Sequence, residues 1–97
     1  MRNVITEKVP GGKLVRIKAE SDEKITSLQI TGDFFLYPES TIEELERTMI
    51  GTPTSMPKEE LKAKLEQTIK KHNMTLVGLT ADDLARLTKQ ATTGASK

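Results

Sequence analysis

Apolar and polar residues alternate along three stretches in the first third of the chain, residues 4–9, 14–19 and 24–31. Alternation with a period of two is typical of strands that bury one face of a sheet. Because the connections between these stretches are short, the pattern predicts an antiparallel meander of three strands. In the third stretch, Ile25 falls on the opposite face from Leu28 and Ile30, which predicts a bulge or an edge contact at that point.

The first two predicted strands are joined by Pro10-Gly11-Gly12. Proline fixes φ and glycine accepts positive φ, so these residues are typical of a tight turn between strands. A glycine pair before a lysine is also a feature of phosphate-binding loops. Such loops need more glycines at fixed spacing and a following helix, whereas a strand follows here. We therefore interpret Gly11 and Gly12 as turn residues.

Beyond Pro38 the apolar residues recur every three or four positions, which is typical of a helix. Either Ser40 or Thr41 is expected to cap its start, because each is followed three residues later by a glutamate, the spacing of a capping box. Gly51 is expected to close this helix in the left-handed conformation. The apolar stripe of the helix comprises Ile42, Leu45 and Met49.

Two further helices are predicted. One runs from Pro57, which suits an initial helical turn, to about His72. The other begins at Thr80, which is expected to cap it, with acidic residues in the first turn. Between them, residues 74–79 form either a short apolar connection or an additional strand. Residues 92–97 are small and polar, and we expect them to form a flexible tail.

This order of elements predicts an α+β fold with two layers, in which a small antiparallel three-stranded sheet packs against about three helices. Residues 1–91 are expected to form a single domain. Its second sheet face, with Arg16, Lys18 and Gln29, is expected to meet water or a partner.

Composition narrows the possible functions. Hydrophobic residues make up 35% of the 97 residues and aromatic residues 3%, so the core is thin and a partner surface would add stability. Fifteen basic and fourteen acidic side chains give a net charge of +1, which provides no electrostatic case for nucleic-acid binding. The absence of cysteine excludes a disulfide scaffold, a thiolate zinc site and a cysteine nucleophile.

No stretch of the sequence has the length of a membrane span or of a signal-peptide core. The longest apolar run is the four residues from Phe34 to Tyr37. We therefore expect a soluble, cytoplasmic protein.

The junction between the strands and the helices contains both phenylalanines and the only tyrosine of the chain. Asp33 stands there between Gly32 and Phe34, where desolvation would raise its pKa or where it would bind a cation. An aspartate after a glycine more often holds a turn by bonding nearby backbone N–H groups. No second catalytic group accompanies Asp33, so we interpret it as a turn residue.

His72 is the only histidine. Acid–base catalysis requires an orienting partner, and the sequence places neither a carboxylate nor a second metal ligand beside it. Its position at the end of a predicted helix, after Lys70 and Lys71, suits the helix dipole instead. The residues alone therefore indicate a module without catalytic chemistry of its own.

The sequence Gly-Asp-Phe-Phe at residues 32–35 leads into Ile-Glu-Glu-Leu-Glu at 42–46 and a closing Ile-Gly at 50–51, and the hairpin Lys-Val-Pro-Gly-Gly-Lys-Leu at 8–14 precedes them. Together these segments resemble the accessory domain of lipoate–protein ligases, over about residues 5–90. In single-chain bacterial ligases this domain lies C-terminal to the catalytic domain. In many archaea it is a separate small subunit, and the present sequence is similar to that split form.

The resemblance implies a role in the ATP-dependent attachment of lipoate to a lysine of acceptor proteins, namely lipoyl domains of 2-oxoacid dehydrogenases and the glycine-cleavage H protein. The family first forms lipoyl-AMP and then transfers the lipoyl group. Its catalytic residues lie in the large domain, and none has a counterpart here. The resemblance therefore implies a heterodimer with a large catalytic subunit, in which this chain supports the adenylation step. It implies that lipoate, ATP and Mg²⁺ are used by the complex and that none is bound by this chain alone.

The same resemblance makes the junction a candidate partner interface, because aromatic side chains concentrate binding energy. Successive side chains of an extended segment point to opposite sides, so we expect one residue to be buried and the others to lie at the contact. A different interpretation is a stand-alone protein-binding or assembly module without a role in lipoate activation. An independent small enzyme would lack a nucleophile or base. The candidate interface residues are Asp33, Phe34, Phe35, Leu36 and Tyr37.

Overall fold

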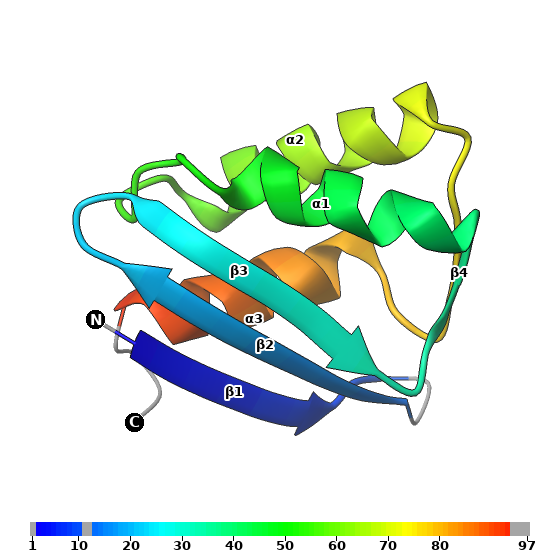
Figure 1. Ribbon diagram of the computed structural model, residues 1–97, viewed down its shortest axis with the longest axis horizontal. Coiled ribbons are helices and arrows are strands. Elements are labelled where there is room, and N and C mark those ends of the chain that lie inside the picture. Colours follow the sequence, from blue (N-terminus) through cyan, green and yellow to red (C-terminus); the bar gives the residue numbers. More distant parts are fainter. Residues whose placement is uncertain (1, 11–12, 94–97) are drawn as a thin grey trace.

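The computed structural model describes residues 2–10 and 13–93. Within them, an antiparallel sheet has the strand order β1 (Arg2–Lys8), β2 (Leu14–Ser21) and β3 (Ile25–Gly32) (Figure 1). The helices α1 (Ile42–Met49), α2 (Lys58–Lys71) and α3 (Ala81–Thr93) form the second layer. The predicted α+β fold and the three-stranded meander are confirmed.

The helices cover one face of this sheet (Figure 1). Helix α3 packs on β1 and β2, α1 packs beside β3, and α2 contacts both α1 and α3. The apolar side of β2 and the inner stripes of the three helices meet between the layers, which is where alternating and helical periodicities direct their apolar residues. The largest fully buried side chains there include Ile17, Leu45, Met49, Leu61, Leu65, Leu84 and Leu87.

A bulge returns Ile25 to the core side of β3. Glu20 pairs with Ser27, but the next residue of β2, Ser21, pairs with Ile25, so Thr26 is the extra residue. Ile25 is consequently 2% exposed, on the same side of the sheet as Leu28. The bulge that the sequence predicted as one of two alternatives is confirmed, and its physical reason is the burial of Ile25.

Beyond β3 the chain forms a short strand, β4 (Phe35–Tyr37), which pairs antiparallel with β5 (Thr75–Val77). Residues 74–79 therefore include a strand, one of the two structures that the sequence allowed. We call this pair the β4–β5 ribbon. It lies at the end of the molecule where β3 ends (Figure 1).

Two of the predicted helix ends are confirmed. Gly51, directly after the C-cap of α1, has a φ of +90°, and its amide donates to the carbonyl of Ile25 over 2.7 Å. Thr80 caps α3: its hydroxyl accepts from the Asp83 amide over 3.1 Å, and the Asp83 carboxylate accepts from the Thr80 amide over 3.0 Å. This reciprocal pair satisfies two N–H groups that the helix leaves free.

The cap predicted for α1 is wrong. Thr41 occupies the N-cap position and Ser40 lies in the preceding 3₁₀ turn, η1 (Glu39–Thr41), but neither side chain caps the helix. The Thr41 hydroxyl donates to the Pro38 carbonyl instead. Thr41 has a helical backbone, with φ −77° and ψ −6°, whereas side-chain capping requires an extended one.

Helix α3 extends through Thr93, two residues into the segment expected to form a tail, and Thr92 is buried. The Thr92 hydroxyl donates to the carbonyl of Thr88, one helical turn earlier, over 2.8 Å. The turn predicted at Gly11 and Gly12 and the remainder of the expected tail, residues 94–97, lie outside the described residues.

Candidate functional site

The outer face of the β4–β5 ribbon is largely apolar. Cross-strand partners share a face of a sheet, so Phe35 stands beside Val77, while Leu36 and its partner Leu76 point inward. Leu36 is 6% exposed, whereas Phe35, Tyr37 and Val77 are 57%, 56% and 49% exposed. We call Phe35, Tyr37 and Val77 the ribbon surface.

This arrangement follows from the alternation of β4. Of the aromatic run, Leu36 is the buried member, Phe34 is half-buried against the core, and Phe35 and Tyr37 remain at the surface. One of the two phenylalanines does point inward, as the extended pattern predicted. The sequence did not indicate that Val77 would join the exposed side chains, because it reaches them only through the pairing of β4 with β5.

The turn that leads from β3 into the ribbon is held by backbone groups. The Asp33 amide donates to the carbonyl of Leu14 over 2.9 Å. At Gly32, a Cβ atom would meet that same carbonyl oxygen at 2.1 Å, so only glycine fits there. No hydrogen bond joins the Asp33 carboxylate to the described residues, and the residue is exposed. The prediction that its side chain holds the turn is therefore wrong, since water can solvate the carboxylate there.

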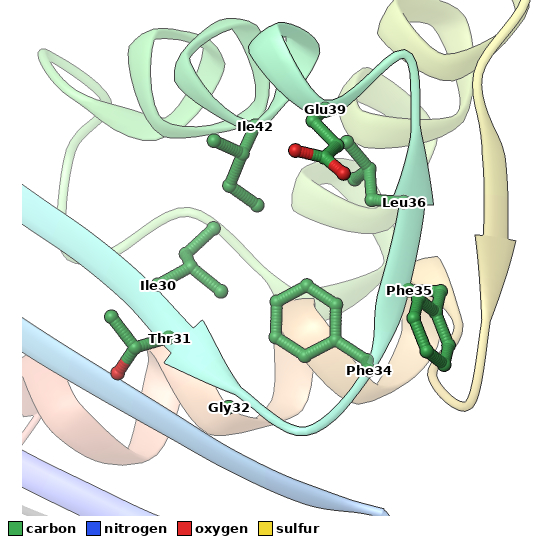
Figure 2. A pocket seen from close by; sticks show the side chains of 8 residues that line it. All are labelled: Ile30, Thr31, Gly32, Phe34, Phe35, Leu36, Glu39 and Ile42. Carbon is green, nitrogen blue, oxygen red and sulfur yellow. The ribbon is translucent and has the colours of Figure 1, made fainter.

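An open groove of about 420 Å³ lies between the end of β3, the ribbon and η1. The ring of Phe34 points into it, while that of Phe35 lies on the other side of the chain (Figure 2). Ile30, Leu36 and Ile42 contribute apolar walls, and Glu39 contributes the charged group of the lining. The groove thus suits an apolar group and would repel an anion.

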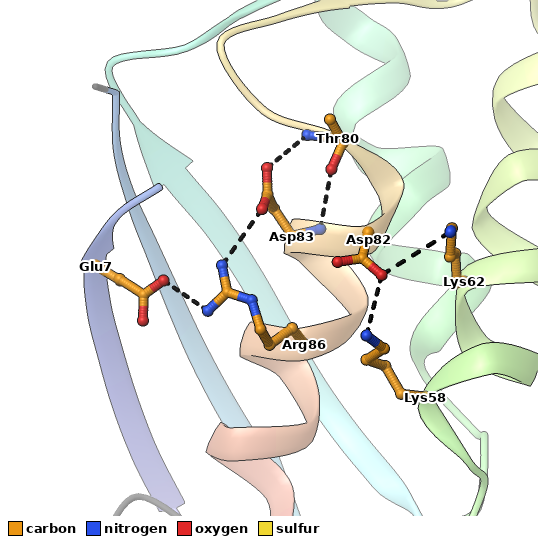
Figure 3. A network of polar contacts seen from close by, with 7 residues as sticks. All are labelled: Glu7, Lys58, Lys62, Thr80, Asp82, Asp83 and Arg86. Carbon is orange, nitrogen blue, oxygen red and sulfur yellow. Dashed lines mark hydrogen bonds and ion pairs between the residues drawn. The ribbon is translucent and has the colours of Figure 1, made fainter. Parts of the chain in front are cut away.

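A polar network ties α3 to the sheet and to α2 (Figure 3). Arg86 donates to Glu7 of β1 over 2.6 Å and to Asp83 over 3.3 Å. Burial disfavours the charged guanidinium, but its hydrogen bonds to the carboxylates of Glu7 and Asp83 outweigh this effect and raise the pKa of Arg86. The contact with Glu7 joins residues far apart in the sequence, and no local pattern could have indicated it.

A second part of the network joins α2 to α3. Lys58 Nζ lies 3.1 Å from Asp82 Oδ1, and Lys62 Nζ lies 3.9 Å from the same oxygen (Figure 3). The hydrogen bond between Lys58 and Asp82 lowers the pKa of Asp82 and raises that of Lys58. The Asp82 carboxylate therefore joins two packed helices, which is an ordinary role of charges on helix surfaces.

His72 has a neighbouring carboxylate that the sequence did not reveal. It follows α2 directly, and its Nε2 lies 3.8 Å from Glu44 Oε1 of α1. Among residues 2–10 and 13–93, no group of three or more His, Asp and Glu side chains could hold a metal ion.

Over the same residues, every helix is too short or too polar to span a bilayer.

Comparisons with known proteins agree with the resemblance seen in the sequence. A structure from Thermoplasma acidophilum, described as an archaeal lipoylation system with a bi-partite lipoate protein ligase and its E2 lipoyl domain, matches with a TM-score of 0.69. The match covers 90% of this chain and 96% of the other at 20% sequence identity, which shows a shared fold. No curated protein sequence matches the chain. The family model of the bacterial lipoate protein ligase C-terminus matches residues 2–87, and the chain therefore belongs to that family.

Proposed function

We propose that this chain is the accessory, non-catalytic subunit of a two-part lipoate–protein ligase. It acts with a large catalytic subunit in the ATP-dependent activation of lipoate to lipoyl-AMP, which precedes transfer to a lysine of an acceptor protein. The observation that carries the proposal is the ribbon surface on a member of this ligase family.

The ribbon surface has the chemistry of a docking site. Phe35, Tyr37 and Val77 project from one face of two paired strands, where their apolar area is in contact with water. Contiguous apolar area of this kind marks an interaction site, and aromatic residues near its centre supply most of the binding energy. In this proposal the large subunit covers the ribbon surface in the complex.

The chain contributes to adenylation by position rather than by chemistry. Lipoyl-AMP is a mixed anhydride that water hydrolyses, so its formation requires an active site closed to solvent. A small subunit docked at the rim of that site can order its loops and exclude water, then shift to admit the acceptor. The activity therefore belongs to the complex.

The groove beside Phe34 is poorly suited to lipoate or ATP. The charged group of the groove beside Phe34 is the carboxylate of Glu39, which would repel both the lipoate carboxylate and the phosphates of ATP. The described acids likewise offer no cluster for a metal ion. In the proposal these three ligands are held by the large subunit.

The experiment compares the large subunit with and without this chain. Formation of lipoyl-AMP is measured from lipoate and ATP, and transfer is measured separately from preformed lipoyl-AMP. We expect adenylation to depend on the chain. Equal rates of lipoyl-AMP formation with and without the chain would exclude the accessory role. Binding of the chain to an acceptor but not to the large subunit would favour a stand-alone protein-binding module.

A further inference from the structure

The three-stranded sheet has a second face, which points away from the helices. Register places its side chains in rows across β1, β2 and β3. We call this surface the outer sheet face. Its rows are Arg2–Glu20–Ser27, Val4–Lys18–Gln29, Thr6–Arg16–Thr31 and Lys8–Leu14.

The outer sheet face concentrates positive charge. It has four basic side chains and one acidic side chain, although the net charge of the whole chain is only +1. The acidic residue, Glu20, forms an ion pair with Arg2, whose Nε lies 3.6 Å from Glu20 Oε2. Lys8, Arg16 and Lys18 form no ion pair with any of the described residues, and Arg16 is held in place by a hydrogen bond to the Thr6 hydroxyl. Their charge is therefore presented to solvent.

We propose that the outer sheet face docks the acceptor protein, through an acidic surface of the acceptor. This inference rests on the proposed function, in which the chain has two protein partners with different kinetic requirements. The large subunit must remain bound from one turnover to the next, whereas each acceptor must arrive, react and leave.

The two surfaces of the chain differ in the way that these requirements demand. Phe35, Tyr37 and Val77 offer apolar area for a stable contact, as in the centres of lasting interfaces. Lys8, Arg16 and Lys18 offer separated charges on a largely polar surface. Charges of this kind accelerate encounter with an oppositely charged partner and permit rapid dissociation.

A short stretch of chain joins the two surfaces. β3 ends at Gly32, and the amide of the next residue, Asp33, bonds the carbonyl of Leu14 on β2. The ribbon begins two residues later, at Phe35. A large subunit on the ribbon surface would therefore border the Lys8–Leu14 end of the outer sheet face, and an acceptor docked there would lie beside the catalytic subunit.

Nucleic acid is a weaker candidate for the same charges. Proteins that bind single strands combine a positive groove with aromatic side chains on which bases stack. The exposed aromatic residues, Phe35 and Tyr37, lie on the ribbon instead of on the outer sheet face. The three basic side chains without an ion pair among the described residues, Lys8, Arg16 and Lys18, also provide little positive charge for a surface that must bind a phosphate backbone.

The test reverses charge on the outer sheet face in the complete two-subunit ligase. The variant is Arg16→Glu combined with Lys18→Glu, and its control is Lys64→Glu, a charge reversal at an exposed residue of α2. We expect the KM for the acceptor to rise about tenfold in the double variant with kcat unchanged, and its dependence on salt to weaken. Lys64→Glu should leave the KM for the acceptor as it is.

Formation of lipoyl-AMP separates this inference from the proposed function. If the outer sheet face serves the acceptor alone, the double variant forms lipoyl-AMP at the wild-type rate. An unchanged KM for the acceptor, or a loss of adenylation, would overturn the inference while leaving the accessory role intact. If the wild-type chain has no effect on adenylation, the proposed function fails, and direct titration of the acceptor against the chain still tests the outer sheet face.

The same variants are titrated against duplex DNA, single-stranded DNA and vesicles containing an anionic lipid. Binding of any of these by the wild-type chain, lost in the double variant while the KM for the acceptor stays the same, would assign the outer sheet face to that ligand instead. Circular dichroism of each variant establishes that the fold is intact.

Discussion

The backbone amide of Ile30 on β3 donates to Glu46 Oε2 on α1 over 2.8 Å. β3 is an edge strand, and an unpaired N–H on such an edge would otherwise remain open to another chain. The contact therefore both fastens α1 to the sheet and satisfies a donor at its edge.

Replacement of Glu46 by alanine should lower the free energy of unfolding by about 1–2 kcal/mol, because it removes the partner of a partly buried N–H. Glu46→Gln keeps an acceptor and should lose less. Glu43→Ala, on the exposed side of the same helix, serves as the control and should change stability by no more than about 0.5 kcal/mol. Urea denaturation measures all three, and equal losses in Glu46→Ala and Glu43→Ala would show that the hydrogen bond contributes nothing.

Removal of both exposed aromatic rings, by Phe35→Ala with Tyr37→Ala, should weaken binding to the large subunit. The loss expected for two aromatic interface residues is about 2–4 kcal/mol. Ile50→Ala removes a comparably exposed apolar side chain, 40% exposed, outside the ribbon and should leave affinity unchanged. Calorimetric titration gives the affinities, and an unaltered dissociation constant with an intact fold would exclude the ribbon surface from the interface.

Gly32→Ala and Gly51→Ala should differ in stability although both glycines have positive φ. At Gly32 the new methyl group meets the Leu14 carbonyl oxygen, whereas at Gly51 no atom lies within 4 Å. We expect losses of about 2 kcal/mol or more at Gly32 and about 1 kcal/mol at Gly51, the latter from backbone strain alone. Chemical denaturation decides between this order and equal losses, which would mean that the turn relaxes away from the contact.

Stability should fall with acidity partly through Asp82. Its hydrogen bond with Lys58 holds its pKa in the folded protein below the ordinary value of 3.8. The contribution of this pair is therefore present above about pH 4 and is lost as the pH falls through the lowered pKa. The midpoint temperatures of thermal unfolding of wild type and Asp82→Asn, measured between about pH 2 and 6, should converge at the acid end of this range. A difference that stays constant across that range would show that the charge of Asp82 is not its source.

Alternation and helical spacing correctly indicated the three-stranded meander, the helices and their buried stripes, since these patterns express which side of an element faces away from water. The bulge beside Ile25 was predictable for the same reason. The lack of a side-chain cap on α1 was not predictable, because the 3₁₀ turn before the helix gives Thr41 a helical backbone. Local spacing identifies a candidate cap but does not reveal the conformation of its backbone.

The sequence by itself determined the layers of this domain and the location of its aromatic run, because local periodicity and turn chemistry act within a few residues. Only the tertiary structure decided that Phe35 and Tyr37 stay exposed beside Val77, since β4 and β5 are distant in sequence and must pair to form one surface. It likewise brought Arg86 to Glu7 and aligned the cations of the outer sheet face. Such contacts depend on the register and packing of whole elements, which minimise unpaired polar groups and exposed apolar area across the entire chain.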